Sequence, residues 1–331
     1  MSSSVVESGQ PSVMVILVNW NGWKDTINCA SSVMASNFLN IKILIVDNGS
    51  TDGSIEQIID WANQKNVVLS VVHLQTEDIR TSRHNLDARI YLLLSGKNFG
   101  FASGCNAAIR YAADNLHSNY FFFLNNDAIV NQETIGRLVE SAARIDGLGA
   151  LGAMIYDYDD RSRLQAYGGG YVIPFLGYSW LIRGQRKSNR IKSTFVADAY
   201  ISGACMMIPA ATIDRIGLMD EGYFLYWEDA DWCKRMTKAD LTLVIDNRAK
   251  VFHKHGGSGR GIRPFILRCQ TRSSIRYAKK YYPNAWWIYL FPIVILRAAR
   301  ILKTADVHLL KSVIGGAVSA IRGTRISPIV K

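Results

Sequence analysis

The stretch Tyr120–Val130 reads YFFFLNNDAIV, and it decides the predicted fold. Its apolar run, FFFL, predicts a strand that is buried on both faces. Asn125-Asn126-Asp127 then ends the strand with polar side chains. In α/β proteins a buried strand often delivers an acidic residue to a site at its carboxyl end. An Asx turn that closes a core strand explains the same residues equally well, so the flanking segments must decide.

Segments on both sides of this stretch alternate between apolar strands and amphipathic helices. Before it, strands are predicted at 13–18, 41–46, 67–74 and 90–94, and helices at 24–36, 54–63 and 107–115. After it, a helix is predicted at 131–145 and a strand at 148–156. This alternation predicts a mainly parallel sheet flanked by helices, an α/β fold. The polar residues 75–89 have no clear period and predict a surface insertion, such as a hairpin arm.

The composition is that of an ordinary globular protein. The chain has 331 residues, 49% of them hydrophobic and 20% charged, which suits one large domain or one domain with an appendage. Five dispersed cysteines without a CxxC pair indicate a reducing compartment, with neither a disulfide framework nor a zinc knuckle. The N-terminal residues MSSSVVESGQPS lack the basic region and apolar core of a signal peptide.

Polar clusters follow four of the predicted strands, at residues 19–22, 47–53, 98–106 and 125–127. Because the carboxyl ends of parallel strands share one edge of a sheet, the clusters are expected to converge there. Taken singly, each is better explained as a capped turn. Asp47 can accept a hydrogen bond from a ligand's ring N–H or hydroxyl, and the glycine-rich 98–106 loop can offer backbone N–H groups to an anion. That loop matches neither GxGxxG nor a P-loop, which disfavours a dinucleotide oxidoreductase.

Two further groups of polar residues carry possible chemistry. Asp127 is a hard oxygen donor, and His253 or His255 can complete a Mg²⁺ or Mn²⁺ site with it, although both histidines also suit an exposed loop. Glu228 and Asp229 follow a segment rich in aromatic residues (GYFLYW). Acids are favoured at a helix start, but crowded carboxylates beside aromatic rings also suit a general base acting on a sugar.

Taken in order, seven motifs resemble the inverting glycosyltransferases of family 2, especially their bacterial rhamnosyltransferase-like branch. The motifs are VILVNWNG (Val15–Gly22), IVDNGSTDGS (Ile45–Ser54), NFGFASGCNAAI (Asn98–Ile109), FLNNDA (Phe123–Ala128), SGACMMI (Ser202–Ile208), GLMDEGYFLYWEDADWCKR (Gly217–Arg235) and VFHKHGGS (Val251–Ser258). Together they cover roughly residues 13–258 and are specific for the family but not for the sugar. The resemblance implies a GT-A fold, with a mixed, mainly parallel sheet, and a nucleotide-sugar donor.

The resemblance also implies roles for individual residues. Asp229 matches the catalytic base, and Asp127 matches the last acid of the metal-binding DXD motif, whose first acid is here replaced by Asn125. His253 matches the late metal-binding histidine best, with His255 as the alternative, and Mg²⁺ or Mn²⁺ is the implied cofactor. The implied donor-binding residues are Asn19, Asn21, Asp47, Asn98, Gly100, Asn106, Asn125, Asn126 and Asp127. The implied acceptor-binding residues are Gly203, Trp227 and Glu228.

The function implied by the resemblance is metal-dependent, inverting transfer of a sugar to a hydroxyl of a lipid-linked glycan in cell-surface polysaccharide synthesis, such as O-antigen synthesis. The expected donor is dTDP-L-rhamnose, and a UDP-sugar (Gal, Galf or GlcNAc) is the alternative. A nucleotide-sugar-binding homologue with impaired catalysis is the other alternative, because the DXD motif is altered. The expected location is the cytoplasmic, inner face of the plasma membrane.

The C-terminal segment differs from the rest of the chain, which suggests a catalytic domain at 1–260 and a basic helical tail at 261–331. Residues 254–331 hold 15 Lys or Arg and a single acid, a net charge of +14. The whole chain carries +11, so the remaining residues carry −3. The apolar run 285–296 is 12 residues long and contains Pro292, too short for a span of about 20 residues. Its Trp and Tyr beside Arg and Lys suit an anionic membrane surface.

The tail also suits partners other than a membrane. A helical cap or a homo-oligomer surface packed on the catalytic domain is the alternative to the membrane. Nucleic acid is not expected, because it accounts for the basic tail but not for the acidic clusters of the first 253 residues.

Overall fold

The computed structural model of the protein describes residues 9–74, 85, 87–183, 189–194, 196–254, 262–302, 306–324 and 326. The central strands are β1 (Val13–Asn19), β2 (Ile41–Asp47), β3 (Leu69–His73), β4 (Ile90–Leu94), β5 (Tyr120–Leu124), β7 (Leu148–Asp157), β11 (Arg190–Ile191), β13 (Cys205–Pro209) and β14 (Thr242–His253). They form one sheet in the order β11-β14-β7-β13-β5-β1-β2-β4-β3. Two short strands join it, β6 (Ala128–Val130) on β14 and β8 (Leu164–Ala166) on β7.

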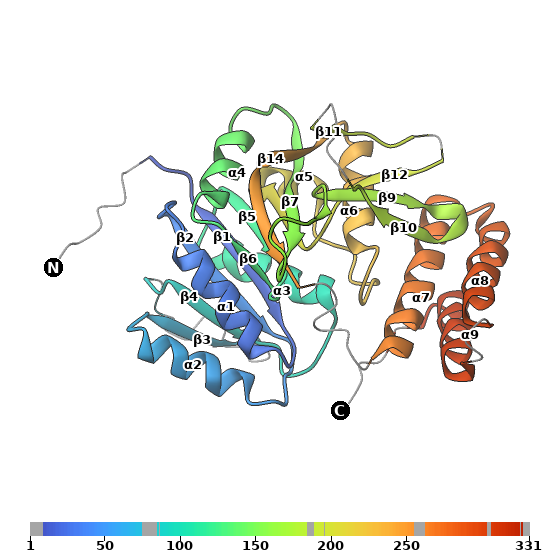
Figure 1. Ribbon diagram of the computed structural model, residues 1–331, viewed down its shortest axis with the longest axis horizontal. Coiled ribbons are helices and arrows are strands. Elements are labelled where there is room, and N and C mark those ends of the chain that lie inside the picture. Colours follow the sequence, from blue (N-terminus) through green and yellow to red (C-terminus); the bar gives the residue numbers. More distant parts are fainter. Residues whose placement is uncertain are drawn as a thin grey trace.

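The half of the sheet from β5 to β3 is parallel throughout, as the sequence predicts. β13 runs antiparallel between β5 and β7, which makes the whole sheet mixed. The flanking helices are α1 (Trp23–Met34), α2 (Ser54–Gln64), α3 (Phe101–Asn115), α4 (Thr134–Ala142), α5 (Ala210–Ile216) and α6 (Glu228–Lys238). Figure 1 shows the N-terminal strands with α1 and α2 at one end of the molecule.

Strand β1 explains why the apolar runs become central strands. Val15 and Leu17 pack into the hydrophobic cluster on the α1 and α2 side, whereas Met14 and Ile16 pack into the cluster on the α3 side. Side chains alternate between the two faces of a strand, so a continuous apolar run is buried on both. The strand therefore tolerates polar residues only at its end, where Asn19 lies.

The middle of the chain forms a second, smaller sheet. It consists of β9 (Gly169–Ile173), β10 (Tyr178–Leu181) and β12 (Asp198–Ile201), all antiparallel. A single turn of 3-10 helix, η2 (Pro174–Leu176), joins β9 to β10. Strand β12 also lies against α6.

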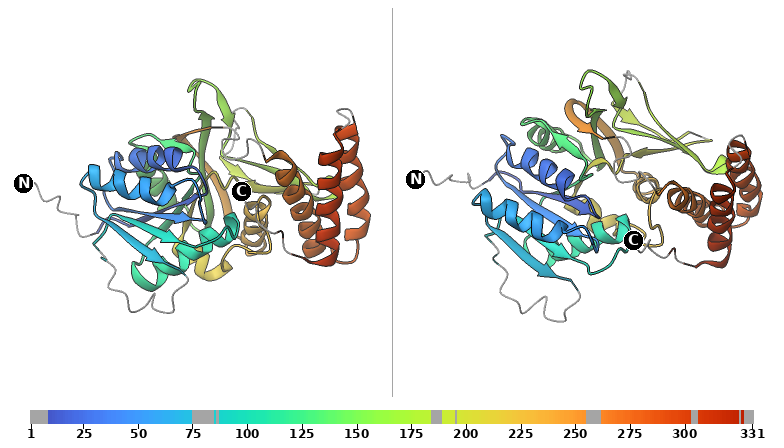
Figure 2. Two further views of the ribbon diagram at one scale, coloured as in Figure 1. Left: turned by 90° about the horizontal axis from the view of Figure 1, so that it is seen from below. Right: turned by 60° about the horizontal axis from the view of Figure 1, so that its bottom comes forward.

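Three helices complete the chain: α7 (Arg263–Tyr281), α8 (Trp286–Leu302) and α9 (Val307–Arg322). They stand together at the end of the molecule opposite the N-terminal strands (Figure 1), and α8 and α9 lie side by side in both views of Figure 2. No helix in the described part of the chain combines the length and apolarity needed to cross a membrane.

The position of α7 bears on the predicted domain boundary near residue 260. Arg272 and Tyr277 of α7 are buried; Arg272 donates a hydrogen bond to the carbonyl of Gly222, and Tyr277 donates to Asp198 of β12 over 2.9 Å. The contacts therefore join α7 to the sheet-bearing part of the chain. The division at residue 260 stays a prediction.

Two predictions of secondary structure need correction. The helix predicted to begin at Ala107 begins at Phe101, so most of the predicted 98–106 loop is helical. The short strand β6, which pairs with β14 directly after Asp127, was not predicted. Most of the insertion predicted at 75–89 lies outside the described residues.

Candidate functional site

The predicted polar clusters do converge at the carboxyl edge of the parallel strands. Asn19 at the end of β1 donates to the carboxylate of Asp47 at the end of β2, over 2.8 Å. Thr26 donates to the side-chain oxygen of Asn19 over 2.8 Å, and Asn126, which follows β5, donates to Thr26 over 2.9 Å. A chain of side-chain hydrogen bonds thus joins three strand ends, and all four side chains are buried.

The loops after β1 and β2 are tied to each other. The side-chain oxygen of Asn21 accepts the N–H of Thr51 over 2.7 Å, and Asn21 itself has a left-handed backbone with a φ of 53°. The Ser50 hydroxyl lies within hydrogen-bond distance of both Asn19 and the N–H of Asn21. These contacts fix the two loops beside Asp47, whose other oxygen accepts the N–H of Ser50.

The segment around Gly100 differs from what the sequence predicts. The N–H of Phe99 points to Asn48 over 3.3 Å, that of Gly100 to Asn98 over 2.9 Å, and that of Phe101 to the carbonyl of Phe224 over 2.9 Å. These three N–H groups thus already have partners within the chain, and a contact of the 98–106 segment with an anion stays a prediction. Gly100 instead permits a close approach: its φ is 93°, and a Cβ there would lie 2.3 Å from the Phe224 oxygen.

Asn106 has a different position from the other predicted donor-binding residues. It lies in α3, fully buried, where its amide donates to the carbonyl of Met219 and to Glu221, both over 2.9 Å. Its oxygen accepts the N–H of Met219 over 3.0 Å. These contacts anchor the 217–227 loop on α3, and a contact with donor stays a prediction.

Asp127 and His253 are brought together, as the sequence predicts for a cation site. Nε2 of His253 lies 3.1 Å from Oδ1 of Asp127 and 3.2 Å from the amide nitrogen of Asn125. Nδ1 lies 2.9 Å from Oε1 of Gln165. That contact favours the tautomer with a proton on Nδ1, which turns the Nε2 lone pair toward the Asp127 carboxylate.

These two side chains fit a divalent cation. A carboxylate oxygen and an imidazole nitrogen that face each other can both donate lone pairs to a cation between them. Mg²⁺ and Mn²⁺ often take only one or two protein ligands beside phosphate oxygens and water. Among the described residues no cluster of three or more His, Cys, Asp or Glu side chains offers a complete set of ligands. The alternative ligand, His255, lies outside the described residues.

Glu228 and Asp229 open helix α6. An oxygen of Asp229 accepts the N–H of Gly203 over 3.1 Å, and the other accepts the N–H of Ala230 over 2.8 Å. Burial raises the pKa of Asp229 above the usual value of an aspartate, against the lowering effect of these hydrogen bonds. Burial and the nearby Asp229 raise the pKa of Glu228 well above its ordinary value, and Oε2 of Glu228 is buried without a hydrogen-bond partner.

The two residues before these acids have unusual backbones. Tyr226 and Trp227 have φ values of 66° and 73°, in a region that side-chain-bearing residues rarely adopt. The Trp227 ring is buried against Tyr277 at 5.2 Å, whereas Tyr226 is 38% exposed. Burial, with help from Glu228, Cys269 and Asp127, raises the pKa of Tyr226 to about 12. The exposed ring beside the acids is thus Tyr226, and an acceptor contact by Trp227 stays a prediction.

Comparisons with known proteins assign the family. Residues 14–211 match the family model described as glycosyl transferase family 2. The chain belongs to this family. An N-acetylglucosaminyl-diphospho-decaprenol L-rhamnosyltransferase of Mycobacterium tuberculosis is 23% identical over 263 residues, which cover 75% of this chain and 77% of that protein. A rhamnosyltransferase of Escherichia coli K12 is 24% identical over 200 residues, 56% of this chain and 72% of the relative.

A solved structure confirms the fold of this family 2 glycosyltransferase. The mannosyltransferase of Pyrobaculum calidifontis, in complex with GDP-Man and Mn²⁺, superposes with a TM-score of 0.56 at 13% identity, over 95% of this chain and 88% of that one. The predicted GT-A fold and the predicted resemblance to the rhamnosyltransferase-like branch are therefore confirmed. The chain is a glycosyltransferase.

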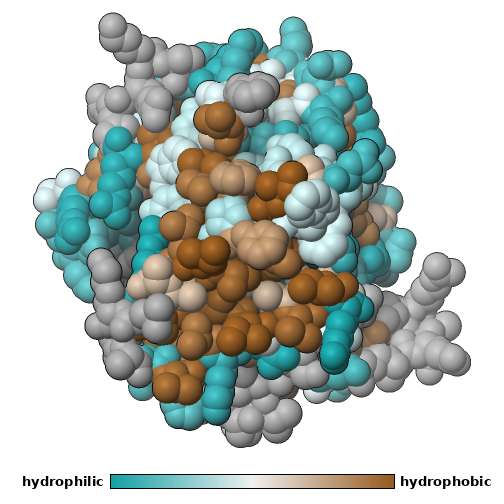
Figure 3. Space-filling model, turned by 90° about the vertical axis from the view of Figure 1, so that its right-hand side faces the viewer, coloured by the Kyte–Doolittle hydropathy of each residue, from teal (hydrophilic) through white to brown (hydrophobic). Residues whose placement is uncertain are grey.

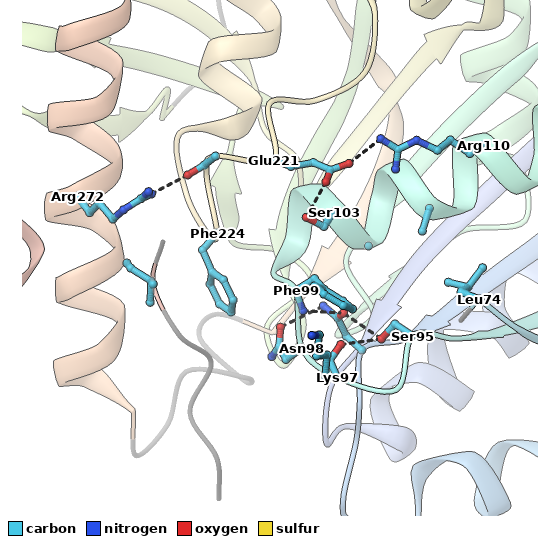
Figure 4. A pocket seen from close by; sticks show the side chains of 15 residues that line it. Leu74, Ser95, Lys97, Asn98, Phe99, Ser103, Arg110, Glu221, Phe224 and Arg272 are labelled. Carbon is cyan, nitrogen blue, oxygen red and sulfur yellow. Dashed lines mark hydrogen bonds and ion pairs between the residues drawn. The ribbon is translucent and has the colours of Figure 1, made fainter. Parts of the chain in front are cut away.

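A cavity of about 520 Å³ lies beside the strand edge of the glycosyltransferase, on the α3 side. Figure 4 shows Asn98, Phe99 and Ser103 on one side and Phe224 and Arg272 on the other, with Glu221 bonded to Ser103 and Arg110. The cavity includes Asn98 but not Asp127, Asp229 or His253. The geometry of the strand ends, rather than this cavity, is therefore the better guide to the chemistry.

Sequence reasoning missed the groups that hold α6 in place. Asp231 in α6 is fully buried and lies 2.7 Å from Lys280 and 3.0 Å from the hydroxyl of Tyr281, both in α7. Lys280 also contacts Asp220 over 3.0 Å, in the loop that leads to α6. The sequence marks Lys280 only as one charge of a basic helix, so nothing local distinguishes it as a partner of a buried acid. Gln165, the partner of His253, was missed for the same reason.

Proposed function

We propose that the protein transfers L-rhamnose from dTDP-L-rhamnose to a hydroxyl of a lipid-linked glycan, with inversion at the anomeric carbon. The observation that carries the chemistry is the placement of Asp229, whose carboxylate is held by the Gly203 N–H at the start of α6. Burial and the nearby Asp229 raise the pKa of its neighbour Glu228 well above the ordinary value of a glutamate. A pair of acids whose pKa values are pushed apart provides one ionised base beside one neutral acid.

Asp229 takes the proton of the acceptor hydroxyl as that oxygen attacks the anomeric carbon. The new glycosidic bond forms from the oxygen, the bond from the anomeric carbon to the nucleotide breaks, and its electron pair leaves with the diphosphate. A single displacement of this kind inverts the configuration. The raised pKa of Asp229 brings the base closer to neutral pH, where proton transfer is most effective.

The donor is held at the strand edge. Asp47 is fixed by Asn19 and Ser50 and accepts a hydrogen bond from the base, and Asn21 shapes the adjoining loop. Asn98, whose side chain is within hydrogen-bond distance of Asn48, lies at the same edge. In this assignment Asn126 acts through Thr26, as a support for the network and not as a contact.

Asp127 and His253 would hold a divalent cation, Mg²⁺ or Mn²⁺, with Asn125 beside them. The cation, when bound, neutralises charge that develops on the departing diphosphate. Support comes from the facing oxygen and nitrogen donors and from the Mn²⁺ in the P. calidifontis structure. Gln165 sets the tautomer of His253 so that Nε2 is free to act as a ligand.

The sugar and the acceptor are proposed from the relatives' names. Both relatives described above are rhamnosyltransferases, and the M. tuberculosis protein is named for a polyprenyl-diphosphate acceptor. A UDP-sugar remains the alternative donor within the family.

The experiment is a donor panel. Thermal unfolding is followed with Mn²⁺ and each of dTDP-rhamnose, UDP-Gal, UDP-GlcNAc and GDP-Man, and transfer to a polyprenyl-diphosphate-GlcNAc acceptor is then measured with any donor that binds. We expect the largest shift and transfer with dTDP-rhamnose. A larger shift with a UDP-sugar would replace the donor, and binding without transfer to any acceptor would favour a binding protein that has lost catalysis.

A further inference from the structure

The end of the molecule formed by α8 and α9 carries an apolar face. Figure 3 shows hydrophobic side chains gathered there, with hydrophilic residues around them. The exposed apolar residues of α8 are Trp287, Ile288, Phe291, Ile295 and Leu296, and those of α9 are Val307, Ile314, Val318 and Ile321. Most residues of each set are spaced so that they lie on one side of their helix. Ile293 and Val313, in contrast, are buried in the hydrophobic clusters of the C-terminal helices. A contiguous apolar face of this kind marks an interaction site.

The hairpin between β9 and β10 extends this face, although it lies more than a hundred residues earlier in the chain. Phe175 in η2 is 45% exposed and its ring contacts Tyr289 of α8 at 5.4 Å. Arg297 of α8 donates to the carbonyl of Gly177 over 2.7 Å. Gly177 has a φ of 56°, and a Cβ there would come 2.7 Å from Ile293. The hairpin is thus tightly seated on α8, and the apolar face is built from two separate parts of the chain.

Aromatic and basic side chains border the face. Arg300 lies over the Tyr178 ring at 5.2 Å, and Lys279 lies over the Trp286 ring at 4.9 Å. Lys311 and Arg322 are exposed on α9. The only acid between residues 254 and 331 is Asp306, which caps the start of α9. Apolar side chains surrounded by Trp, Tyr and basic residues match the depth profile of an anionic membrane interface.

We infer that this composite face, made of α8, α9 and the β9–β10 hairpin, docks on an anionic lipid bilayer without crossing it. A second copy of the chain fits less well, because a two-fold contact would place the same basic border against itself. The inference rests on the proposed function only in that a lipid-linked acceptor resides in a bilayer. It assigns the membrane contact to Phe175 as well as to the C-terminal helices.

Flotation with the full-length protein tests this inference. Vesicles of phosphatidylcholine with about 30% phosphatidylglycerol are compared with pure phosphatidylcholine, in low and high salt. The variants are Phe291→Asp on α8, Val318→Asp on α9 and Phe175→Asp on the hairpin. Leu39→Asp is the matched control, because Leu39 is 55% exposed but lies in the N-terminal half of the chain.

We expect the wild type to float with the anionic vesicles and less at high salt. Each face variant is expected to lose at least tenfold in binding, while the control binds as the wild type does. Unchanged thermal stabilisation by nucleotide-sugar in the face variants would show that they are folded, and keeps this test separate from that of transfer. Absence of flotation by the wild type, or equal flotation of wild type and all variants, would overturn the inference. So would a dimer that Phe291→Asp dissociates. If only Phe175→Asp floats normally, the hairpin is not part of the face.

Discussion

The strand edge and the start of α6 are both polar and buried, yet they are built in opposite ways. At the strand edge every buried side chain has partners: Asn19, Asp47, Thr26 and Asn126 form one chain of hydrogen bonds. At the start of α6, Oε2 of Glu228 has none, and Tyr226 and Trp227 have left-handed backbones. A fully satisfied network gives rigidity, whereas unpaired acids and strained backbones persist only where the surroundings hold them. We infer that the first region holds the donor and the second carries out the proton transfer.

Breaking the strand-edge network is expected to have the largest effect on stability. Asp47→Ala removes the carboxylate that accepts from the buried amide of Asn19 and from the N–H of Ser50. At about 1–3 kcal/mol for each unsatisfied donor, the free energy of unfolding falls by about 4 kcal/mol. The variant is also expected to lose stabilisation by nucleotide-sugar. Urea unfolding checks this against Asp60→Ala, whose side chain is exposed on α2. Equal stability of the two variants would contradict the role of the network.

The contact between the two regions is tested at Gly100. A Cβ in Gly100→Ala meets the Phe224 carbonyl, and the positive φ adds strain. The free energy of unfolding is therefore expected to fall by about 3 kcal/mol. Gly217→Ala is the matched control, because its φ of 78° is similar but no atom lies within 4 Å of the added carbon. It is expected to cost about 1 kcal/mol. Thermal unfolding of both variants separates the steric clash with Phe224 from the cost of the positive φ. If Gly100→Ala is as stable as the control, the loop that carries Phe224 moves away freely.

The partner of His253 is expected to have a smaller effect. Gln165→Leu removes the acceptor for Nδ1–H and should weaken Mn²⁺ binding. The Mn²⁺ concentration for half-maximal transfer should rise by about 10-fold or more, and stabilisation by Mn²⁺ with nucleotide should fall. Gln165→Glu keeps an acceptor in place and is expected to restore most of the affinity. If leucine and glutamate behave alike, Gln165 does not orient the histidine.

Glu228, the unpaired acid, is expected to have the smallest effect on transfer, and its main effect is expected on the pH dependence of stability. Burial raises the pKa of Glu228, so the folded state binds its proton more tightly than the unfolded state does. The stability this provides is complete below the unfolded pKa and is lost as the pH rises through the raised folded pKa. Glu228→Gln mimics the neutral acid, so transfer near neutral pH should change by less than about threefold, and the loss of stability with rising pH should diminish. Unfolding measured between about pH 5 and 8 checks this, and an unchanged pH dependence would contradict it.

The sequence predicted the buried strands and the meeting of their polar ends better than it predicted the contacts of single groups, for a physical reason. Apolar runs such as VMVILV specify buried strands by their period, and polar residues after parallel strands must meet at one edge. Short-range pattern does not reveal that the N–H groups around Gly100 are already paired, or that α3 begins at Phe101. Nor does it reveal Lys280 and Gln165, whose importance comes from contacts with residues 49 and 88 positions away.

The division of roles between the two regions is tested most directly by Asp229→Asn, with donor affinity and turnover measured on the same preparation. If Asp229 removes the acceptor proton, turnover at saturating donor is expected to fall by about 10²–10⁴-fold. Donor affinity should stay within about threefold of the wild type, because the strand-edge network that holds the donor remains intact. Normal turnover in this variant would show that another group is the base. Loss of donor affinity would show that donor binding and proton transfer are not assigned to separate regions.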